Sequence, residues 1–335
     1  MSMLTNSLLV REIRMKLWRA MQMAAPQGEQ GTFSDPADLP PVDSTQWEVE
    51  DREAFTSPEM ETFRASLRDG DRTVRESLLD DLATYHGITP QEARDFCLHW
   101  EQKSVEEWAS TGASTSDAGR VEFYRTTQSW SFDLTWWAYL QSECRTAPST
   151  VLALRFLQQY SPGRRHLDFG SGVGVTSQLF NRSGWRSTSA DLSSTLLDFA
   201  RHRHKRRGDD VAYIDLLTGG LPAGNYDAIT AIDTLAHVPD MFDTCRRLHD
   251  ALGPDGVLVA NSISGPRHLR LRGISTVTNF DRSTICGVRA SPRSATSVTG
   301  WWPIGRSETT GPATRCGSFG TGSRWSVPLA GWRAA

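Results

Sequence analysis

The sequence has no long uninterrupted hydrophobic run, and no stretch approaches the roughly 20 apolar residues that a membrane-spanning helix needs. Near its start, Leu8, Leu9 and Val10 are followed at once by Arg11, which is too short a run for the apolar core of a secretory signal. The five cysteines stand far apart with no CxxC pair, which argues against a zinc site or a disulfide framework. We therefore expect a cytoplasmic protein with free thiols, no membrane partner and no metal.

An excess of charge of one sign is also missing, because 36 basic residues face 39 acidic ones and the net charge is −3. So small a net charge provides no general attraction to nucleic acid, and we expect no nucleic-acid partner. Residues 263–335 differ from the rest, with ten Arg, no Lys, and only Asp281 and Glu308 as acids. The last part of the chain is therefore unlike what precedes it.

The composition divides the chain into four parts, of which the last is residues 263–335. Residues 1–72 include a stretch rich in Pro, Asp, Glu and Ser, and we expect an arm and linker there. Capping boxes begin at Thr73 and Thr89, so residues 73–149 are expected to form a helical cap region.

Residues 150–262 alternate strand and helix patterns. Five strands are expected, at 165–169, 186–190, 211–214, 226–232 and 256–261. Strands separated by helices are typical of an α/β fold with a doubly wound, mostly parallel, Rossmann-like sheet. Such a sheet binds its ligand at the carboxyl ends of the strands, where the strand order reverses.

Residues 121–141 are unusually aromatic. If this segment is helical, two sets of side chains share a face: Phe132, Trp136 and Tyr139 on one, and Trp130, Leu134 and Trp137 on another. A helix that is apolar on two faces is buried between layers or lies across a pocket. It is therefore either a core helix that docks the front region or a lid that contacts a ligand.

A Gly-x-Gly-x-Gly turn between a strand and a helix is the most informative motif. Gly170, Gly172 and Gly174 let the backbone approach a ligand closely and aim N–H groups at it. A dinucleotide motif needs a small residue at the next position, where the sequence has Val175. Asp168 precedes the turn, where a carboxylate repels phosphate and attracts a cation. The turn therefore suits a ligand with a positive end and no pyrophosphate, such as S-adenosylmethionine.

A second acidic residue follows the turn at a telling distance. Asp191 stands at the predicted end of the second strand. In related folds, an acid about 20 residues beyond such a turn accepts hydrogen bonds from ribose hydroxyls. We expect the same role for Asp191.

Residues 150–262 resemble the class I S-adenosylmethionine-dependent methyltransferase family, in its small-molecule branch. The segments that carry the resemblance are Leu167-Asp168-Phe169-Gly170-x-Gly172-x-Gly174, Ala190-Asp191-Leu192-Ser193, Tyr226-Asp227-Ala228-Ile229 and Asp233-Thr234-Leu235-Ala236-His237-Val238-Pro239-Asp240. The resemblance implies an enzyme that transfers a methyl group in line from S-adenosylmethionine to a small-molecule acceptor. Its oligomeric state stays open.

The resemblance also implies a role for single residues. The three glycines would line the methionine part of the cofactor, and Asp168 would lie near its ammonium group. Asp191 would hold the ribose. The adenine would lie beside Leu192, Asp215 and Leu216, and Asp233 would face the reacting centre. His237 is the one candidate general base, with a backbone-bonding role as the alternative. His202 and His204, in a basic run at a predicted helix end, are interpreted as partners of the helix dipole on a solvated face.

Residues 263–335 show no sign of the antiparallel strand pair that closes the family's sheet. Few large aliphatic residues are present, so we expect either a disordered basic tail or the product of an altered reading frame. Either would leave the fifth strand as an exposed edge, with weak cofactor binding or poor solubility. Two other functions stay open: a non-catalytic cofactor-binding relative, and an NAD-dependent oxidoreductase on the same sheet.

Overall fold

The computed structural model describes residues 35, 47–113, 115–235, 237–238, 240–261, 285–289 and 299–304. All of them belong to one compact unit, residues 1–305, and the second unit, residues 306–335, lies outside the described residues. Within the described segments, every helix is too short or too polar to serve as a membrane span.

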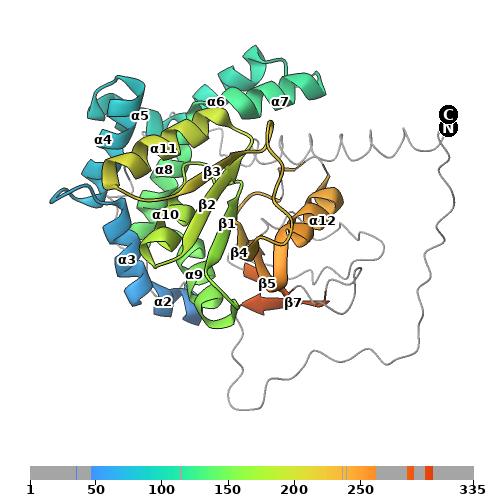
Figure 1. Ribbon diagram of the computed structural model, residues 1–335. Coiled ribbons are helices and arrows are strands. Elements are labelled where there is room, and N and C mark those ends of the chain that lie inside the picture. Colours follow the sequence, from blue (N-terminus) through green and yellow to red (C-terminus); the bar gives the residue numbers. More distant parts are fainter. Residues whose placement is uncertain are drawn as a thin grey trace, which may run out of the picture. The chain divides into compact units, whose positions relative to one another are not determined.

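A seven-stranded sheet in the order β3-β2-β1-β4-β5-β6-β7 forms the centre of the described unit (Figure 1). The strands are β1 (Arg165–Phe169), β2 (Arg186–Asp191), β3 (Ala212–Asp215), β4 (Tyr226–Ala231), β5 (Leu252–Asn261), β6 (Ile285–Arg289) and β7 (Thr299–Ile304). The first five pair in parallel, which confirms the expected doubly wound α/β sheet. The strand order reverses at β1, which has β2 on one side and β4 on the other, and this places a ligand crevice at their carboxyl ends.

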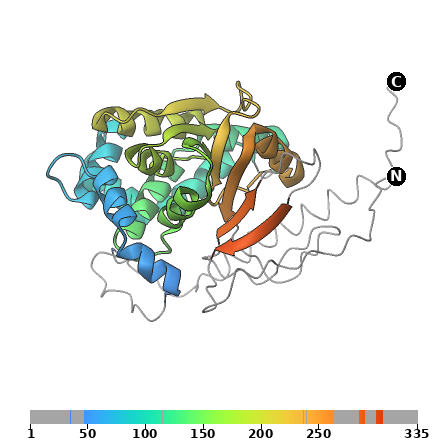
Figure 2. The same ribbon diagram turned by 60° about the horizontal axis from the view of Figure 1, so that its bottom comes forward.

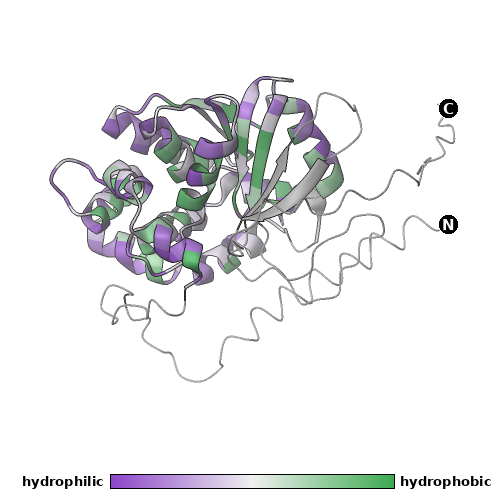
Figure 3. Ribbon diagram, turned by 90° about the horizontal axis from the view of Figure 1, so that it is seen from below, coloured by the Kyte–Doolittle hydropathy of each residue, from purple (hydrophilic) through white to green (hydrophobic). Residues whose placement is uncertain are grey.

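Helices cover both faces of the sheet. Helices α9 (Ser149–Tyr160), α10 (Val175–Arg182) and α11 (Ser194–Arg207) pack on one face, and α12 (Met241–Ala251) packs against β5 on the other. Side chains alternate along β5, so Val257 joins the larger core while Leu258 joins the smaller one. Figure 3 shows hydrophobic residues concentrated on the middle strands and hydrophilic ones on the outer helices.

Strands β6 and β7 extend the sheet beyond β5, where the sequence analysis found none. β6 runs antiparallel to β5, from the pair Val257 and Arg289 to the pair Asn261 and Ile285, and β7 runs antiparallel to β6 (Figure 2). This corrects the expectation that β5 is an exposed edge. An edge strand needs backbone pairing and a short run of β-favouring residues, and the Ile, Val and Trp of these segments meet that need. Most of the expected irregular tail lies outside the described residues.

Part of the expected arm and linker is helical. Helices α2 (Val49–Phe55) and α3 (Pro58–Leu67) form within residues 1–72. The hydroxyl of Ser57 caps α3 by accepting a hydrogen bond from the N–H of Met60, and Pro58 occupies the first helical position. The apolar face of α3 is fully buried: Met60, Phe63 and Leu67. The helix start at Ser57 and Pro58 was not recognised in the sequence because the surrounding residues are mostly polar.

The remaining N-terminal helices are α4 (Val74–His86), α5 (Pro90–Leu98), α6 (Trp100–Ser110), α7 (Asp117–Thr126) and α8 (Ser129–Ser142). The capping boxes at Thr73 and Thr89 both form as predicted. The aromatic segment breaks between α7 and α8. One predicted face of α8 is buried, but Trp137 on the other face is 42% exposed, so α8 has one core face and one face of mixed exposure.

Candidate functional site

The glycine turn follows β1 and leads into α10. Gly170, Gly172 and Gly174 have φ of +70°, +51° and +75°, a left-handed backbone that glycine adopts without strain. The N–H groups of Gly170 and Ser171 donate to the carbonyl of Ala190, at 2.8 and 3.1 Å. The Ser171 hydroxyl is buried and has no hydrogen-bond partner among the described residues. Because an unpaired buried hydroxyl is costly, it is a candidate donor to a ligand.

Side chains of three other segments lie against the turn. A Cβ built on Gly172 would lie 2.6 Å from Cδ1 of Leu134 in α8, and one on Gly174 would lie 2.7 Å from the ring of His204 in α11. Thr234, which follows β4, meets the first glycine in the same way. Only the tip of Leu134 reaches the turn, so a rotamer change of this side chain would open the space above Gly172. The turn can therefore cradle a ligand that displaces Leu134.

Gly174→Ala is expected to lower the free energy of unfolding by roughly 2–3 kcal/mol, of which about 1–2 kcal/mol is left-handed backbone strain. The rest comes from displacing the His204 ring. Gly184→Ala is the matched control, because Gly184 has φ +80° and nothing within 4 Å of its Cβ position. Urea denaturation of both variants measures the difference, and equal losses would contradict the close contact with His204.

Asp191 ends β2 beside the turn. Its Oδ2 accepts a hydrogen bond from the N–H of Gly172, and its Oδ1 accepts one from the N–H of Ser193, both at 2.8 Å. The residue is 8% exposed, and burial raises the pKa of its carboxyl. Each carboxylate oxygen can accept a second hydrogen bond, so Asp191 retains acceptors for a ligand.

The predicted adenine residues lie next to Asp191. Asp215 is its register partner in the β2–β3 ladder, and the N–H of Leu216 donates to the Asp191 carbonyl at 2.9 Å. Leu192 follows Asp191 directly and is half-buried. The structure thus brings these four predicted residues and the glycine turn together at the carboxyl ends of neighbouring strands.

Asp168 lies beneath the turn. Its carboxylate accepts hydrogen bonds from the N–H of Ser177, at 3.1 Å, and from the hydroxyl of Thr230, at 2.9 Å. It is 2% exposed, and burial raises its pKa to about 7. Both oxygens therefore have donors from the protein itself, and the carboxyl ties the start of α10 to β4. Its role near a ligand's ammonium stays a prediction.

The loop after β4 carries the remaining predicted residues. Asp233 has φ +52°, which is uncommon for a residue other than glycine and is often found at functional sites. His237 is exposed, and its ring centroid lies 6.2 Å from that of Trp130 in α8. The loop and the N-terminal half of α8 therefore lie side by side.

Asp133 of α8 is a candidate site residue that the sequence analysis missed. Burial, together with the negative charges of Glu101 and Asp233, raises the pKa of its carboxyl to about 7. Helical spacing could have indicated that Asp133 lies near the site, because it is three residues after Trp130 and next to Leu134 in the sequence. No group of three or more His, Cys, Asp or Glu that could hold a metal ion occurs in the described part of the chain.

The basic run at the end of α11 is only partly solvated. Arg203 is fully buried and His204 is 1% exposed, which corrects the sequence interpretation for His204. His202 contacts the hydroxyl of Thr84 in α4 at 3.1 Å. The end of α11 therefore docks against the N-terminal helices, which a helix viewed alone does not reveal.

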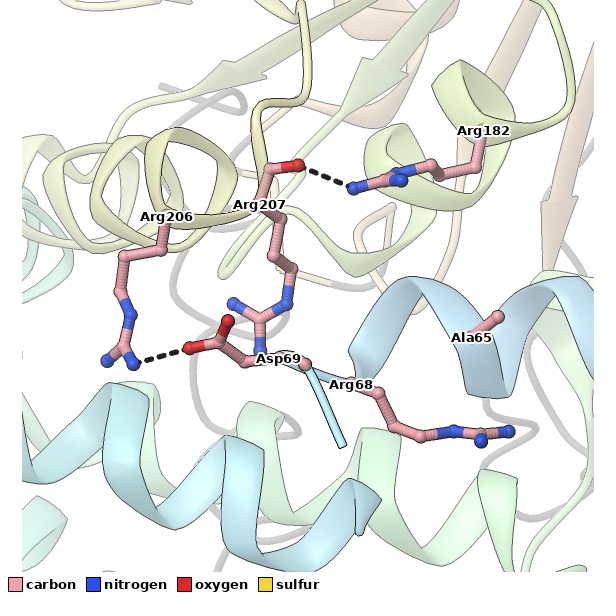
Figure 4. Close-up of a pocket in the computed structure, with 7 residues that line it drawn as sticks. Ala65, Arg68, Asp69, Arg182, Arg206 and Arg207 are labelled. Carbon is pink, nitrogen blue, oxygen red and sulfur yellow. Dashed lines mark hydrogen bonds and ion pairs between the residues drawn. The ribbon is translucent and has the colours of Figure 1, made fainter. Parts of the chain in front are cut away.

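A groove of about 400 Å³ lies at this contact, lined by Ala65, Arg68, Asp69, Gly70, Arg182, Arg206 and Arg207 (Figure 4). Arg206 pairs with Asp69 at 2.6 Å, and Arg182 donates to the carbonyl of Arg207 at 2.7 Å. Three of the arginines, Arg182, Arg206 and Arg207, occupy the last turns of α10 and α11, where positive charge offsets the helix dipole. These three guanidinium groups therefore serve helix ends and ion pairs.

A family model described as "Methyltransferase domain" matches residues 136–303. The match begins earlier and ends later than the resemblance over residues 150–262, and its last part includes β6 and all of β7 except its final residue.

Curated relatives match a shorter stretch. The chain is 33% identical over 107 residues to a ubiquinone biosynthesis O-methyltransferase of Xanthomonas campestris pv. campestris, covering 31% of this chain and 44% of the relative. It is 29% identical over 140 residues to the protein of the same name from Actinobacillus pleuropneumoniae, covering 39% of this chain and 60% of the relative. The chain thus spans about half the length of the curated relatives it matches.

Among solved structures, phosphoethanolamine N-methyltransferase 2 of Haemonchus contortus, in complex with S-adenosylmethionine, is 22% identical. The alignment has a TM-score of 0.31 and covers 36% of this chain and 30% of that one.

Proposed function

Because this chain belongs to the methyltransferase-domain family, we propose that it transfers a methyl group from S-adenosylmethionine to a small-molecule acceptor. The observation that carries the proposal is the contact of Asp191 with the glycine turn, beside Asp215. A carboxylate at this point of a doubly wound sheet can hold ribose hydroxyls, and a turn without side chains admits a charged chain close to its backbone.

The cofactor would be held by residues of four segments. The turn at Gly170, Gly172 and Gly174 would take the methionine part, and the buried Ser171 hydroxyl, which has no partner within the described residues, would be an added donor. Asp191 would accept from the ribose, and Leu192, Asp215, Leu216 and Asp233 would flank the adenine and the reacting centre. When bound, S-adenosylmethionine supplies a methyl group on a positively charged sulfur. The protein's task is then to orient the acceptor, and positioning alone can supply roughly 7–11 kcal/mol of the barrier.

We further propose that the methyl group is transferred to an oxygen atom of the acceptor. The two relatives reported above are named O-methyltransferases, and a hydroxyl acceptor must lose a proton during transfer. His237, beside Trp130, is the proposed general base, and the aromatic ring favours an apolar or planar acceptor. His237→Ala is expected to lower kcat without changing the affinity for the cofactor.

The experiment measures binding and turnover separately. Calorimetry with S-adenosylmethionine and with NAD tests the cofactor, and release of S-adenosylhomocysteine with hydroxylated aromatic compounds or matched amines tests the acceptor. We expect binding of S-adenosylmethionine only, and turnover with a hydroxyl. Tight S-adenosylmethionine binding without turnover on any acceptor would favour a non-catalytic relative. Stabilisation against heat by NAD alone would favour an oxidoreductase and overturn the proposal.

A further inference from the structure

The buried guanidinium of Arg203 contacts three separate parts of the structure. Its Nη1 donates to the carbonyl of Val173 in the glycine turn at 2.7 Å, and its Nη2 donates to Oε1 of Gln178 in α10 at 3.1 Å. Its Nε donates to Oδ2 of Asp81 in α4 at 3.3 Å. Both Arg203 and Asp81 have fully buried side chains. A buried charge requires a partner of opposite sign, and Asp81 supplies it.

The next residue holds the next carbonyl of the turn. Nε2 of His204 lies 2.9 Å from the carbonyl oxygen of Gly174, and Nδ1 lies 2.7 Å from the hydroxyl of Tyr213. A carbonyl cannot donate, so Nε2 carries the proton and Nδ1 accepts from the tyrosine. Burial and the charge of Arg203 lower the pKa of His204 to about 3, which keeps the ring neutral. Two consecutive residues of α11 thus fix two consecutive carbonyls of the turn.

Asp81 is the only one of these groups that comes from the N-terminal helices. It also accepts a hydrogen bond from Nη1 of Arg207 at 3.0 Å and forms an ion pair with Nη2 of Arg207 at 2.8 Å. Position 81 precedes the segment that matches the family, residues 136–303. Asp81, the counter-ion of the Arg203 guanidinium that binds the turn, therefore comes from a part of this chain outside the segment that matches the family.

We propose that Asp81 is a positioning residue for the cofactor site. Asp81 holds Arg203 in place, and Arg203 fixes the orientation of the Val173 carbonyl and with it the backbone conformation of the glycine turn. Docking of the N-terminal helices is thereby coupled to cofactor binding. The inference rests on the proposed function, because it treats the turn as the cofactor's binding site. Coupling is reciprocal, so the bound cofactor also stabilises the docked α4.

Asp81→Asn is the decisive variant, because it keeps the shape of the side chain and removes its charge. Asp80→Asn is its matched control: Asp80 is the neighbouring carboxylate on α4, and it pairs with Arg206 and Arg72 without contacting Arg203. Calorimetry with S-adenosylhomocysteine is expected to show about tenfold weaker binding by Asp81→Asn and no more than about a twofold change for Asp80→Asn. The KM for the cofactor should rise while kcat at saturating cofactor is retained.

The double variant Asp81→Asn/Arg203→Met separates positioning from stability. Removing both charges restores part of the thermal midpoint lost in Asp81→Asn, because Arg203 is no longer buried without a counter-ion, whereas Arg207 still loses its partner Asp81. Cofactor affinity stays weak, because the donor to Val173 is gone. Wild-type affinity in either variant would overturn the proposal, and the double variant decides alone if Asp81→Asn does not fold.

Amide hydrogen exchange in the ligand-free protein tests the positioning without any cofactor. We expect faster exchange of residues 170–174 in Asp81→Asn than in wild type or Asp80→Asn, and equal rates would overturn the inference. Absence of S-adenosylhomocysteine binding by the wild type would instead contradict the proposed function, so the two failures are distinguishable.

Discussion

Replacing Asp191 by asparagine is expected to weaken binding of S-adenosylmethionine by roughly 10- to 150-fold, since a hydrogen bond to a charged group contributes roughly 1.5–3 kcal/mol. In the proposed complex, the carboxylate would accept hydrogen bonds from the ribose hydroxyls in addition to those from the N–H groups of Gly172 and Ser193. The amide of asparagine turns one of the two acceptor atoms into a donor. Calorimetric titration with the cofactor measures the loss.

Two further variants separate recognition from folding. Asp198→Asn removes a carboxylate that is 60% exposed on α11, and it should leave the affinity unchanged. Asp191→Glu keeps the charge at a changed distance and should lose less affinity than Asp191→Asn. Unchanged cofactor affinity in a well-folded Asp191→Asn protein would remove the main support for the proposed function.

The second large effect is a pH dependence of stability that arises from Asp168. Burial raises its pKa from 3.8 to about 7, so between pH 4 and pH 7 the unfolded chain releases a proton that the folded protein keeps. The stability of the ligand-free protein therefore falls as the pH rises through this window, by roughly 4 kcal/mol for this group. Asp168→Asn cannot ionise, so its unfolding free energy should lack this part of the slope.

Asp227→Asn provides a control of opposite sign. Arg165 donates backbone and side-chain hydrogen bonds to Asp227, and these hold the pKa of that carboxyl below its usual value. Its contribution is therefore present at neutral pH and is lost only as the pH falls below about 4. Denaturant titrations from about pH 2 to pH 7 compare both variants with wild type, because the Asp227 contribution changes below pH 4 and the Asp168 contribution changes above it. Parallel curves for wild type and Asp168→Asn between pH 4 and pH 7 would rule out the raised pKa.

Local signals carried most of what the sequence predicted correctly. The capping box at Thr73 and Glu76 forms because all of its hydrogen bonds lie within four residues. The strand, glycine turn and helix at the site follow from the same kind of local signal. The resemblance added Asp215 and Leu216, and strand register then placed them beside Asp191.

The predictions of secondary structure failed in two segments whose composition is mostly polar. The arm and linker contain α3, whose buried residues recur at helical spacing. The segment beyond β5 contains β6 and β7, two short runs with β-favouring residues that become strands only by backbone pairing with β5 and with each other.

By itself the sequence determined the parallel sheet, the turn and the acid that follows it, because alternating elements and short-range hydrogen bonds leave a recognisable pattern. Only the tertiary structure decided that Leu134 lies over Gly172, and that Asp81 reaches the turn through Arg203. Asp81 and Arg203 are 122 positions apart along the chain. Contacts at such separations depend on how helices dock, and docking is set by the packing of whole surfaces rather than by any local motif.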